Sequence, residues 1–414
     1  MGINFSLKKK FSLMAKPIGS VCNLDCAYCY YLEKEKLYPA SSTRQEMSEK
    51  TLETYIAQVI YTSIDPVIQF TWHGGEPVMR GLDFFHTVIR LQKKYGAGRK
   101  IENSIQTNGT TLTDEWCRFF RDHDFLVGIS VDGPEHCHDH YRKYSSGQGS
   151  FAKCMKGLEL LLKHKVEFNT LSVVNDYNAK FPLEVYRFLK SIGSRYMQFL
   201  PVVEWIDPSA SPGELRIQPA ISRKHAEVTD WTVNPSDYGD FLIGIFDEWV
   251  RKDVGDYFVL TFDCVLANRM GVPPPVCVSA EVCGHAGVIE HNGDVYACDH
   301  YVFPEYKLGN ISDKSIQALM SEPSQIRFGQ DKKDTLPAYC RKCEYLVLCN
   351  GECPKNRIVK TPEGEAGLNY LCPGFKKFYK HTLPYFEFMA GELVHQRPPS
   401  NVMKWAMGRS SGSR

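Results

Sequence analysis

Eleven of the fifteen cysteines in this 414-residue chain fall into two groups, and this division constrains the fold more than any other feature. One group lies near the start with the spacing C-x3-C-x2-C and comprises Cys22, Cys26 and Cys29. The other lies in the last third and comprises Cys277, Cys283, Cys298, Cys340, Cys343, Cys349, Cys353 and Cys372. Four thiolates ligate one [4Fe–4S] cluster, so eight thiolates ligate two clusters fully, whereas three leave one iron open to a small molecule. The pattern therefore predicts two electron-carrying clusters and one reactive cluster.

The composition excludes several other classes of protein. A hydrophobic content of 43% in 414 residues is enough for one large domain and a smaller one. The formal net charge of +1 gives no electrostatic basis for binding nucleic acid. Disulfide scaffolds are typical of small secreted proteins, and residues 1–17 lack the apolar core of a signal peptide. No stretch approaches the roughly 18 apolar residues of a membrane span. We therefore expect a protein of the reducing cytoplasm without membrane contact.

Short apolar runs alternate with amphipathic stretches from residue 12 to about residue 252. The runs predict strands at residues 13–18, 67–72, 101–107, 126–131, 167–174 and 196–203. Helical periodicity lies between them, for example at Leu52, Tyr55, Ile56, Val59 and Ile60. Six strand–helix units predict a parallel α/β sheet, either a curled, incomplete barrel or an open doubly wound sheet. In both arrangements ligands bind at the carboxyl ends of the strands, where the Cys22 loop and Gly74-Gly75-Glu76 fall.

The composition also divides the chain along its length. We expect the barrel-like part at residues 1–235, a linking helix region at 236–262, a cysteine-rich domain at 263–385 and a C-terminal tail at 386–414. The polar, proline-containing segment 204–232 is expected to be a surface insertion, either a substrate-shaping lid or a disordered loop. Residues after Pro399 are expected to be disordered.

The first cysteine group resembles the signature of the radical S-adenosylmethionine (radical SAM) superfamily. The segment CNLDCAYC at residues 22–29 includes the aromatic residue, Tyr28, that the superfamily shows before the third cysteine. The segment HGGEP at residues 73–77 resembles the superfamily's GGEP motif. The resemblance implies that Tyr28, Gly75 and Glu76 bind the cofactor, with Glu76 supplying charge for the methionine ammonium group. Zinc is the alternative, but no Cys or His directly follows the group to act as a fourth ligand.

Two later strand ends imply further contacts with S-adenosylmethionine. The resemblance places Ser130 against the ribose or the carboxylate, Arg142 on the carboxylate and Val203 against the adenine. Apart from the resemblance, Arg142 suits an ordinary surface salt bridge.

The eight C-terminal cysteines resemble those of the SPASM domain, which carries auxiliary [4Fe–4S] clusters in peptide-modifying radical SAM enzymes. The resemblance implies that the nearer cluster is held by Cys277, Cys283, Cys298 and Cys353. It implies that the outer cluster is held by Cys340, Cys343, Cys349 and Cys372. Two zinc sites would also use all eight thiolates, but zinc does not carry electrons.

Across almost the full chain the sequence is similar to anaerobic sulfatase-maturating enzymes. The similarity rests on Lys16-Pro17, GGEP at 74–77, QTNGT at 106–110, VDGP at 131–134 and DVYACD at 294–299. It implies a partial (β/α)6 barrel followed by a SPASM domain, with three [4Fe–4S] clusters and S-adenosylmethionine.

The implied reaction is oxidation of one Ser or Cys in a (Cys/Ser)-x-Pro-x-Arg motif of a nascent sulfatase to Cα-formylglycine, with flavodoxin or ferredoxin as electron donor. Asp299 is implied as the base, and we expect the adjacent cluster to raise its pKa. A carboxylate that only accepts loop hydrogen bonds or pairs with a cation is the alternative. Other SPASM peptide modifiers, which form thioethers or side-chain crosslinks, and a non-catalytic electron carrier remain rival functions.

Overall fold

The computed structural model describes residues 10–38, 45–207, 215 and 227–410. Most of the 204–232 insertion lies outside these residues. Its described ends form an antiparallel pair of two-residue strands, β7 (Trp205–Ile206) and β8 (Glu227–Val228). Within the described residues, no helix combines the length and the apolar character needed to cross a membrane.

The core of the protein is a curled parallel sheet. Its strands follow one another in chain order as β1 (Ser12–Ala15), β2 (Val67–Trp72), β3 (Lys100–Thr107), β4 (Phe125–Ser130), β5 (Phe168–Val174) and β6 (Tyr196–Pro201). The short β9 (Phe258–Val259) pairs with β6 at the far edge. A doubly wound sheet reverses its strand order at a switch point, and strands β1 to β6 run in one direction without such a reversal. The fold class is therefore confirmed as a partial barrel, and the doubly wound alternative is wrong.

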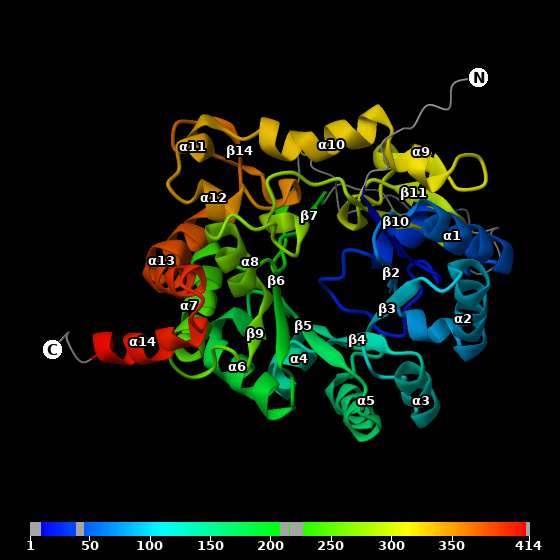
Figure 1. Ribbon diagram of the computed structural model, residues 1–414, viewed down its shortest axis with the longest axis horizontal. Coiled ribbons are helices and arrows are strands. Elements are labelled where there is room, and N and C mark those ends of the chain that lie inside the picture. The colour runs from blue at the N-terminus through cyan, green and yellow to red at the C-terminus, as the bar shows by residue number, and fades with distance from the viewer. Residues whose placement is uncertain (1–9, 39–44, 208–214, 216–226, 411–414) are drawn as a thin grey trace.

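Helices lie around the outside of the curl, as Figure 1 shows. They are α1 (Glu49–Thr62), α2 (Leu82–Gly96), α3 (Asp114–Asp122), α4 (Glu135–Tyr141), α5 (Phe151–His164) and α6 (Pro182–Ser191). Helix α1 shows why they form where they do. The Ser48 side chain accepts a hydrogen bond from the Thr51 amide and so caps the helix. The expected apolar face of α1 is buried at Leu52, Tyr55 and Ile60.

The cysteine-rich part continues the same sheet. After α7 (Pro235–Lys252) and α8 (Leu260–Arg269), the chain returns as β10 (Ala286–Ile289), β11 (Asp294–Tyr296) and β12 (Lys307–Asn310). Strand β10 pairs in parallel with β1, and β11 and β12 follow antiparallel. The two parts of the chain therefore share one ten-stranded sheet.

The remaining elements surround the C-terminal cysteines and end on α7. In chain order they are α9 (Ile316–Met320), α10 (Pro323–Asp334), α11 (Ala338–Arg341), α12 (Leu346–Cys349), β13 (Val359–Lys360), β14 (Ala366–Leu368), α13 (Cys372–Val394) and α14 (Val402–Ser410). Short 3₁₀ helices are η1 (Leu32–Leu37), η2 (Pro77–Arg80), η3 (Asn178–Lys180), η4 (Cys277–Ser279), η5 (Asp299–Tyr301), η6 (Pro304–Tyr306), η7 (Pro354–Asn356) and η8 (Pro399–Asn401). Helix α13 crosses α7 where a Cβ on Gly374 would lie 2.0 Å from the Pro235 carbonyl oxygen, so only glycine allows this approach.

Two expectations about the C-terminal end differ from the structure. Helix α13 runs without a break across the boundary expected between residues 385 and 386. The expectation of disorder after Pro399 is wrong for residues 399–410, which form η8 and α14. The physical reason is apolar packing, because Val402 and Ala406 are fully buried and the Trp405 ring stacks on Phe388 at 5.0 Å.

Candidate active site and cluster positions

The first cysteine group lies in the loop that follows β1. Burial raises the pKa of the Cys22 and Cys26 thiols to about 12, and Cys29 adds to both shifts. Burial also raises the pKa of Cys29. Cys26 is buried, Cys22 and Cys29 are partly buried, and all three pack in one apolar cluster with Leu24 and Tyr28. Their ionisation is costly until a cation binds them. This donor set fits an iron–sulfur cluster.

The Gly75 loop after β2 lies directly against this cysteine loop. The Gly75 amide donates to the Gly19 carbonyl at 2.8 Å, and the Glu76 amide donates to the Val21 carbonyl at 2.8 Å. A Cβ on Gly75 would lie 2.0 Å from the Val21 carbonyl oxygen, so any larger residue would separate the two loops. The structure therefore brings the two superfamily motifs together at the carboxyl ends of β1 and β2.

The Glu76 carboxylate is fully buried and already has internal partners. Its Oε1 accepts from the Thr107 hydroxyl at 2.8 Å and the Val78 amide at 3.1 Å, and its Oε2 accepts from the Asn108 amide at 2.7 Å. Burial raises its pKa to about 7, although these hydrogen bonds oppose the shift. Glu76 thus joins the ends of β2 and β3, while its expected contact with an ammonium group stays a prediction.

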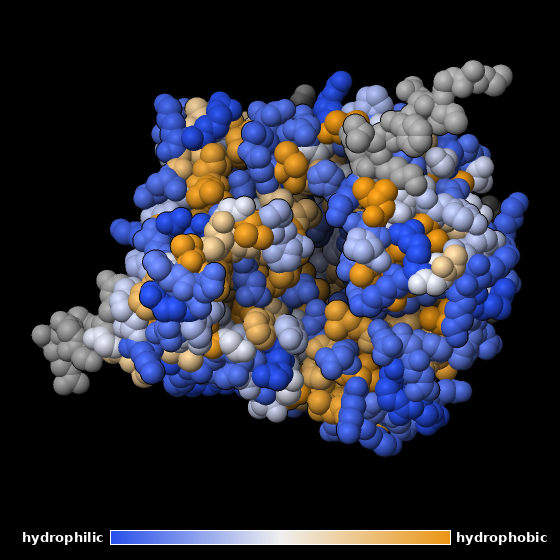
Figure 2. Space-filling view, viewed as in Figure 1, coloured by the Kyte–Doolittle hydropathy of each residue, from blue (hydrophilic) through white to orange (hydrophobic). Residues whose placement is uncertain are grey.

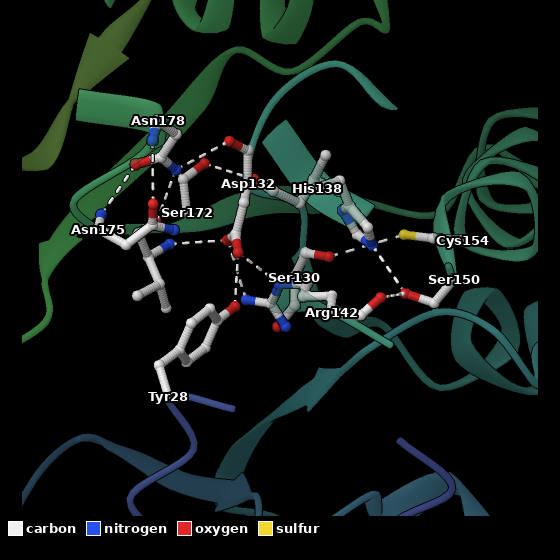
Figure 3. Close-up of polar contacts among 12 residues, drawn as sticks. Tyr28, Ser130, Asp132, His138, Arg142, Ser150, Cys154, Ser172, Asn175 and Asn178 are labelled. Atoms are coloured by element: carbon white, nitrogen blue, oxygen red, sulfur yellow. Dashed lines mark hydrogen bonds and ion pairs between the residues drawn. The ribbon is translucent and has the colours of Figure 1, made fainter. Parts of the chain in front are cut away.

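Asp132, just after β4, contacts Tyr28 and Arg142, two residues that are expected to bind the cofactor, as Figure 3 shows. Its Oδ2 accepts from the Tyr28 hydroxyl at 2.5 Å and lies 2.9 Å from Arg142 Nε. Its Oδ1 accepts from Arg142 Nη2 at 3.1 Å and from the Val173 amide at 2.8 Å. Arg142 is 6% exposed, so the alternative of a surface salt bridge is wrong. The nearby Ser130 hydroxyl accepts from Gln106 Nε2 at 3.1 Å.

Lys355, which the sequence patterns did not predict as important, joins the end of β6 to the cysteine-rich part. Val203 is buried, and its carbonyl accepts a hydrogen bond from Lys355 Nζ. Lys355 Nζ also lies 2.7 Å from a Glu204 carboxylate oxygen. Because Lys355 follows Cys353 by two residues, this contact positions a cysteine loop over the barrel mouth. Figure 2 shows a face of the molecule with a hollow near its centre.

Asp299 lies between the two parts of the chain. One carboxylate oxygen is 2.5 Å from Lys16 Nζ, which follows β1 and is fully buried, and the other accepts from the Tyr30 hydroxyl at 2.5 Å. Burial alone would raise the pKa of Asp299, but Lys16, His73 and His300 outweigh it and hold the pKa below its usual range. The polypeptide itself therefore lowers this pKa through three neighbours that sequence spacing does not show, and the increase expected from the adjacent cluster stays a prediction. Burial lowers the pKa of His73 to about 4, so this imidazole is neutral at pH 7.

Electrostatic coupling and a shared cavity group the C-terminal cysteines in the way that the expected sets do, while the ligation of clusters by these sets stays a prediction. The inner cysteine set comprises Cys277, Cys283, Cys298 and Cys353. Burial raises the pKa of Cys353 to about 12 and that of Cys283 to about 11, and Cys277 adds to both shifts. Burial, Cys353 and Cys277 raise the pKa of Cys298. Cys277 therefore influences each of the other three thiols.

The outer cysteine set lines a single cavity at the N-terminus of α13. The set comprises Cys340, Cys343, Cys349 and Cys372, and the cavity wall also includes Phe375, Lys376 and Tyr379. Burial raises the pKa of Cys349 to about 12, with Cys372 and Cys340 adding to the shift. A helix N-terminus favours negative charge, which suits a cluster held by thiolates.

Within residues 10–38, 45–207, 215 and 227–410, no three side chains of His, Cys, Asp or Glu are placed to hold one metal ion. A structural zinc needs four ligands at about 2.0–2.3 Å from one point, whereas the thiolates of a cubane bind four separate irons. The four cysteines outside the sets are buried, and Cys117 and Cys154 pack on α3 and α5 as expected.

Comparisons with known proteins agree with this geometry. The model of the Radical SAM superfamily matches residues 17–189, and that of SPASM, an iron-sulfur cluster-binding domain, matches residues 281–344. The chain is 51% identical to a serine-type anaerobic sulfatase-maturating enzyme of Bacteroides thetaiotaomicron, over 96% of this chain and 95% of that protein. It is 33% identical to a cysteine-type enzyme of Clostridium novyi, over 94% of this chain and 100% of that protein.

A solved structure shows the same fold. Native anSMEcpe with bound AdoMet and Cp18Cys peptide superposes with a TM-score of 0.80 at 31% identity, over 92% of this chain and 99% of that chain. The chain therefore belongs to the anaerobic sulfatase-maturating enzymes, oxidoreductases of the radical SAM superfamily that use S-adenosylmethionine and [4Fe–4S] clusters.

Proposed function

We propose that this enzyme oxidises one Ser or Cys in a (Cys/Ser)-x-Pro-x-Arg motif of a sulfatase polypeptide to Cα-formylglycine. The observation that carries the proposal is the position of Asp299. Asp299 directly follows Cys298 in the chain, and its carboxylate contacts Tyr30, which directly follows Cys29. A substrate side chain at this carboxylate would therefore lie between the first cysteine group and the inner cysteine set. The 51% identity to a serine-type enzyme supports Ser as the target.

The ligand assignment follows the three cysteine sets. Cys22, Cys26 and Cys29 would hold the cluster with the open iron, and the inner and outer cysteine sets would each hold one auxiliary cluster. The cofactors supply hydrogen abstraction when bound, with S-adenosylmethionine consumed to methionine and 5′-deoxyadenosine. The cofactor site would be shaped by Tyr28, Gly75, Glu76, Ser130, Arg142 and Val203.

Asp299 is the proposed base for the substrate hydroxyl or thiol. The ion pair with Lys16 keeps the carboxylate ionised at neutral pH, as a base requires, and the same ion pair lowers its affinity for a proton. The Tyr30 hydroxyl and Lys16 Nζ each hold one carboxylate oxygen and so fix the orientation of the carboxylate.

The partners and the compartment are also part of the proposal. The electron given up by the substrate would leave through the auxiliary clusters, and flavodoxin or ferredoxin would supply the electron for cofactor cleavage. All fifteen cysteines are free thiols in the structure, which supports a reducing compartment such as the cytoplasm.

The decisive test is an anaerobic reaction with S-adenosylmethionine, reductant and a Ser-containing sulfatase peptide. The peptide should lose two hydrogens and gain an aldehyde that a hydrazine reagent traps, whereas a matched peptide with Ala at the target should not react. A Cys peptide should reach the same aldehyde after hydrolytic loss of sulfur. A thioether or a carbon–carbon crosslink in the product would contradict the proposal and favour another peptide-modifying activity.

A further inference from the structure

Helix α10 has no cysteine, yet one of its faces supports the inner cysteine set. Figure 1 shows this helix in gold along the top of the view. Gln325, Gly329 and Lys332 recur at i, i+4 and i+7, which places them on one side of the helix. All three are buried, although the helix is otherwise polar. Buried Gln and Lys side chains on such a helix require specific polar partners.

Two of these residues fix the loops that carry Cys283 and Cys298. Gln325 Nε2 donates to the Gly284 carbonyl at 2.9 Å and to the Ala297 carbonyl at 3.0 Å. A Cβ on Gly329 would lie 2.3 Å from the Cys283 carbonyl oxygen, so glycine allows the helix to touch this loop. Helix α10 therefore holds in place the backbone beside Cys283 and Cys298.

Lys332 fixes the third loop and brings a charge. Its Nζ donates to the Cys277 carbonyl at 2.6 Å, to the Val278 carbonyl at 2.9 Å and to the Ala280 carbonyl. Carbonyl oxygens only accept hydrogen bonds, so three of them require the three N–H groups of an ammonium ion. Lys332 is 0% exposed. The geometry therefore favours the ammonium form, although burial lowers the pKa of this side chain.

Glu352 and three of the inner thiols interact with this charge. In the described part of the chain, no carboxylate lies within ion-pair distance of Lys332 Nζ, and Glu352 is the acidic residue whose field reaches it most strongly. The Glu352 carboxylate accepts hydrogen bonds from Asn356 and Asn369 instead. Lys332 interacts electrostatically with Cys277, Cys283 and Cys353. A charge in a low-dielectric interior has a stronger effect than one in water.

We propose that Lys332 is a positioning residue whose buried charge makes the inner auxiliary cluster easier to reduce. The inference rests on the proposed function, in which this cluster accepts the electron that the substrate gives up. Reduction adds negative charge to the cluster, and a nearby fixed cation stabilises the reduced form. Net charge, hydrogen bonds and solvent exposure are the known determinants of cluster potentials.

The test is a potentiometric titration of the reconstituted full-length enzyme followed by electron paramagnetic resonance. A variant without the first cysteine group identifies the signals of the two C-terminal clusters. In Lys332→Gln, one of these two clusters should become at least tenfold harder to reduce, which is a shift of about 59 mV for one electron. The other cluster should titrate as in the wild type. No peptide substrate takes part, so this result does not depend on whether the proposed function is correct.

Two control variants separate the charge from the scaffold. Lys332→Arg keeps the charge and should keep the potential close to the wild-type value. Lys333→Met removes the next lysine of α10, which is half-exposed and paired with Glu281, so water and salt should screen its effect.

Each alternative outcome decides the question. An unchanged potential in Lys332→Gln with full iron content would overturn the proposal. If Lys332→Gln loses about one third of its iron while Lys332→Arg retains all of it, the requirement for a cation is supported. Equal iron loss from both variants would overturn the proposal, because Lys332 would then be only a scaffold.

Discussion

The barrel and the cysteine-rich part hold their buried charges in different ways. In the barrel, Asp132 pairs with Arg142, and Glu76 accepts hydrogen bonds from neutral donors of the same sheet. In the cysteine-rich part, Lys332 and Arg357 donate to backbone carbonyls, and thiols of the cysteine sets lie in their fields. The buried charges of the barrel therefore have their partners within the chain itself. The charge balance of the cysteine-rich part is completed when its thiols ionise to bind metal.

The largest expected effect comes from removing the first cysteine group. Replacing Cys22, Cys26 and Cys29 by Ala should abolish cleavage of S-adenosylmethionine and lower the iron content by about one third, because the other two sets remain complete. Iron analysis and 5′-deoxyadenosine formation measure the two effects. Cys117→Ala, which removes a buried thiol outside the sets, should keep both. Full activity of a preparation that holds only zinc would contradict this prediction.

The next effect tests the ion pair that joins the two parts. Asp299→Asn keeps the size of the side chain but cannot accept the proton, so 5′-deoxyadenosine should still form while formylglycine production falls by ~10²–10⁴. Product analysis by mass spectrometry measures both compounds in one reaction.

Iron content must be checked in this variant, because Asp299 adjoins Cys298. Asp313→Asn, a change at an exposed residue of the same part of the chain, should retain normal formylglycine production. Formylglycine production near the wild-type rate in an Asp299→Asn variant with full iron would show that this carboxylate is structural.

The smallest effect concerns the charge balance of the barrel. Asp132→Asn would leave the buried Arg142 guanidinium without its partner, which should lower the free energy of unfolding by about 3–5 kcal/mol. Thermal or urea unfolding of the reconstituted protein measures this loss. Glu49→Gln, in the exposed pair with Arg90, should cost at most about 1 kcal/mol. Similar losses in the two variants would mean that the Asp132 pair is not a special feature of the barrel.

Periodicity and spacing predicted much of the molecule because they report local constraints. The strand positions, the α1 face and the grouping of Cys22, Cys26 and Cys29 depend on residues whose separation in sequence fixes their geometry. The division of the C-terminal cysteines into two sets was implied by the family resemblance instead. The Lys16–Asp299 pair joins residues 283 positions apart, and no spacing rule marks it. The role of Lys332 was invisible for the same reason, since an isolated lysine on a polar helix normally faces solvent.

The pairing of β10 with β1 has a consequence for synthesis on the ribosome. Ser12 lies opposite Ala286, so one edge of the first strand has no partner until more than 270 further residues have been made. Contacts between residues so distant in sequence slow folding, and an exposed strand edge invites association with other chains. The loop that carries Cys22 follows this strand, so the first cysteine group is completed in sequence long before the sheet beside it. We therefore expect the need for chaperones during expression to be set by residues 286–289 as well as by the barrel strands.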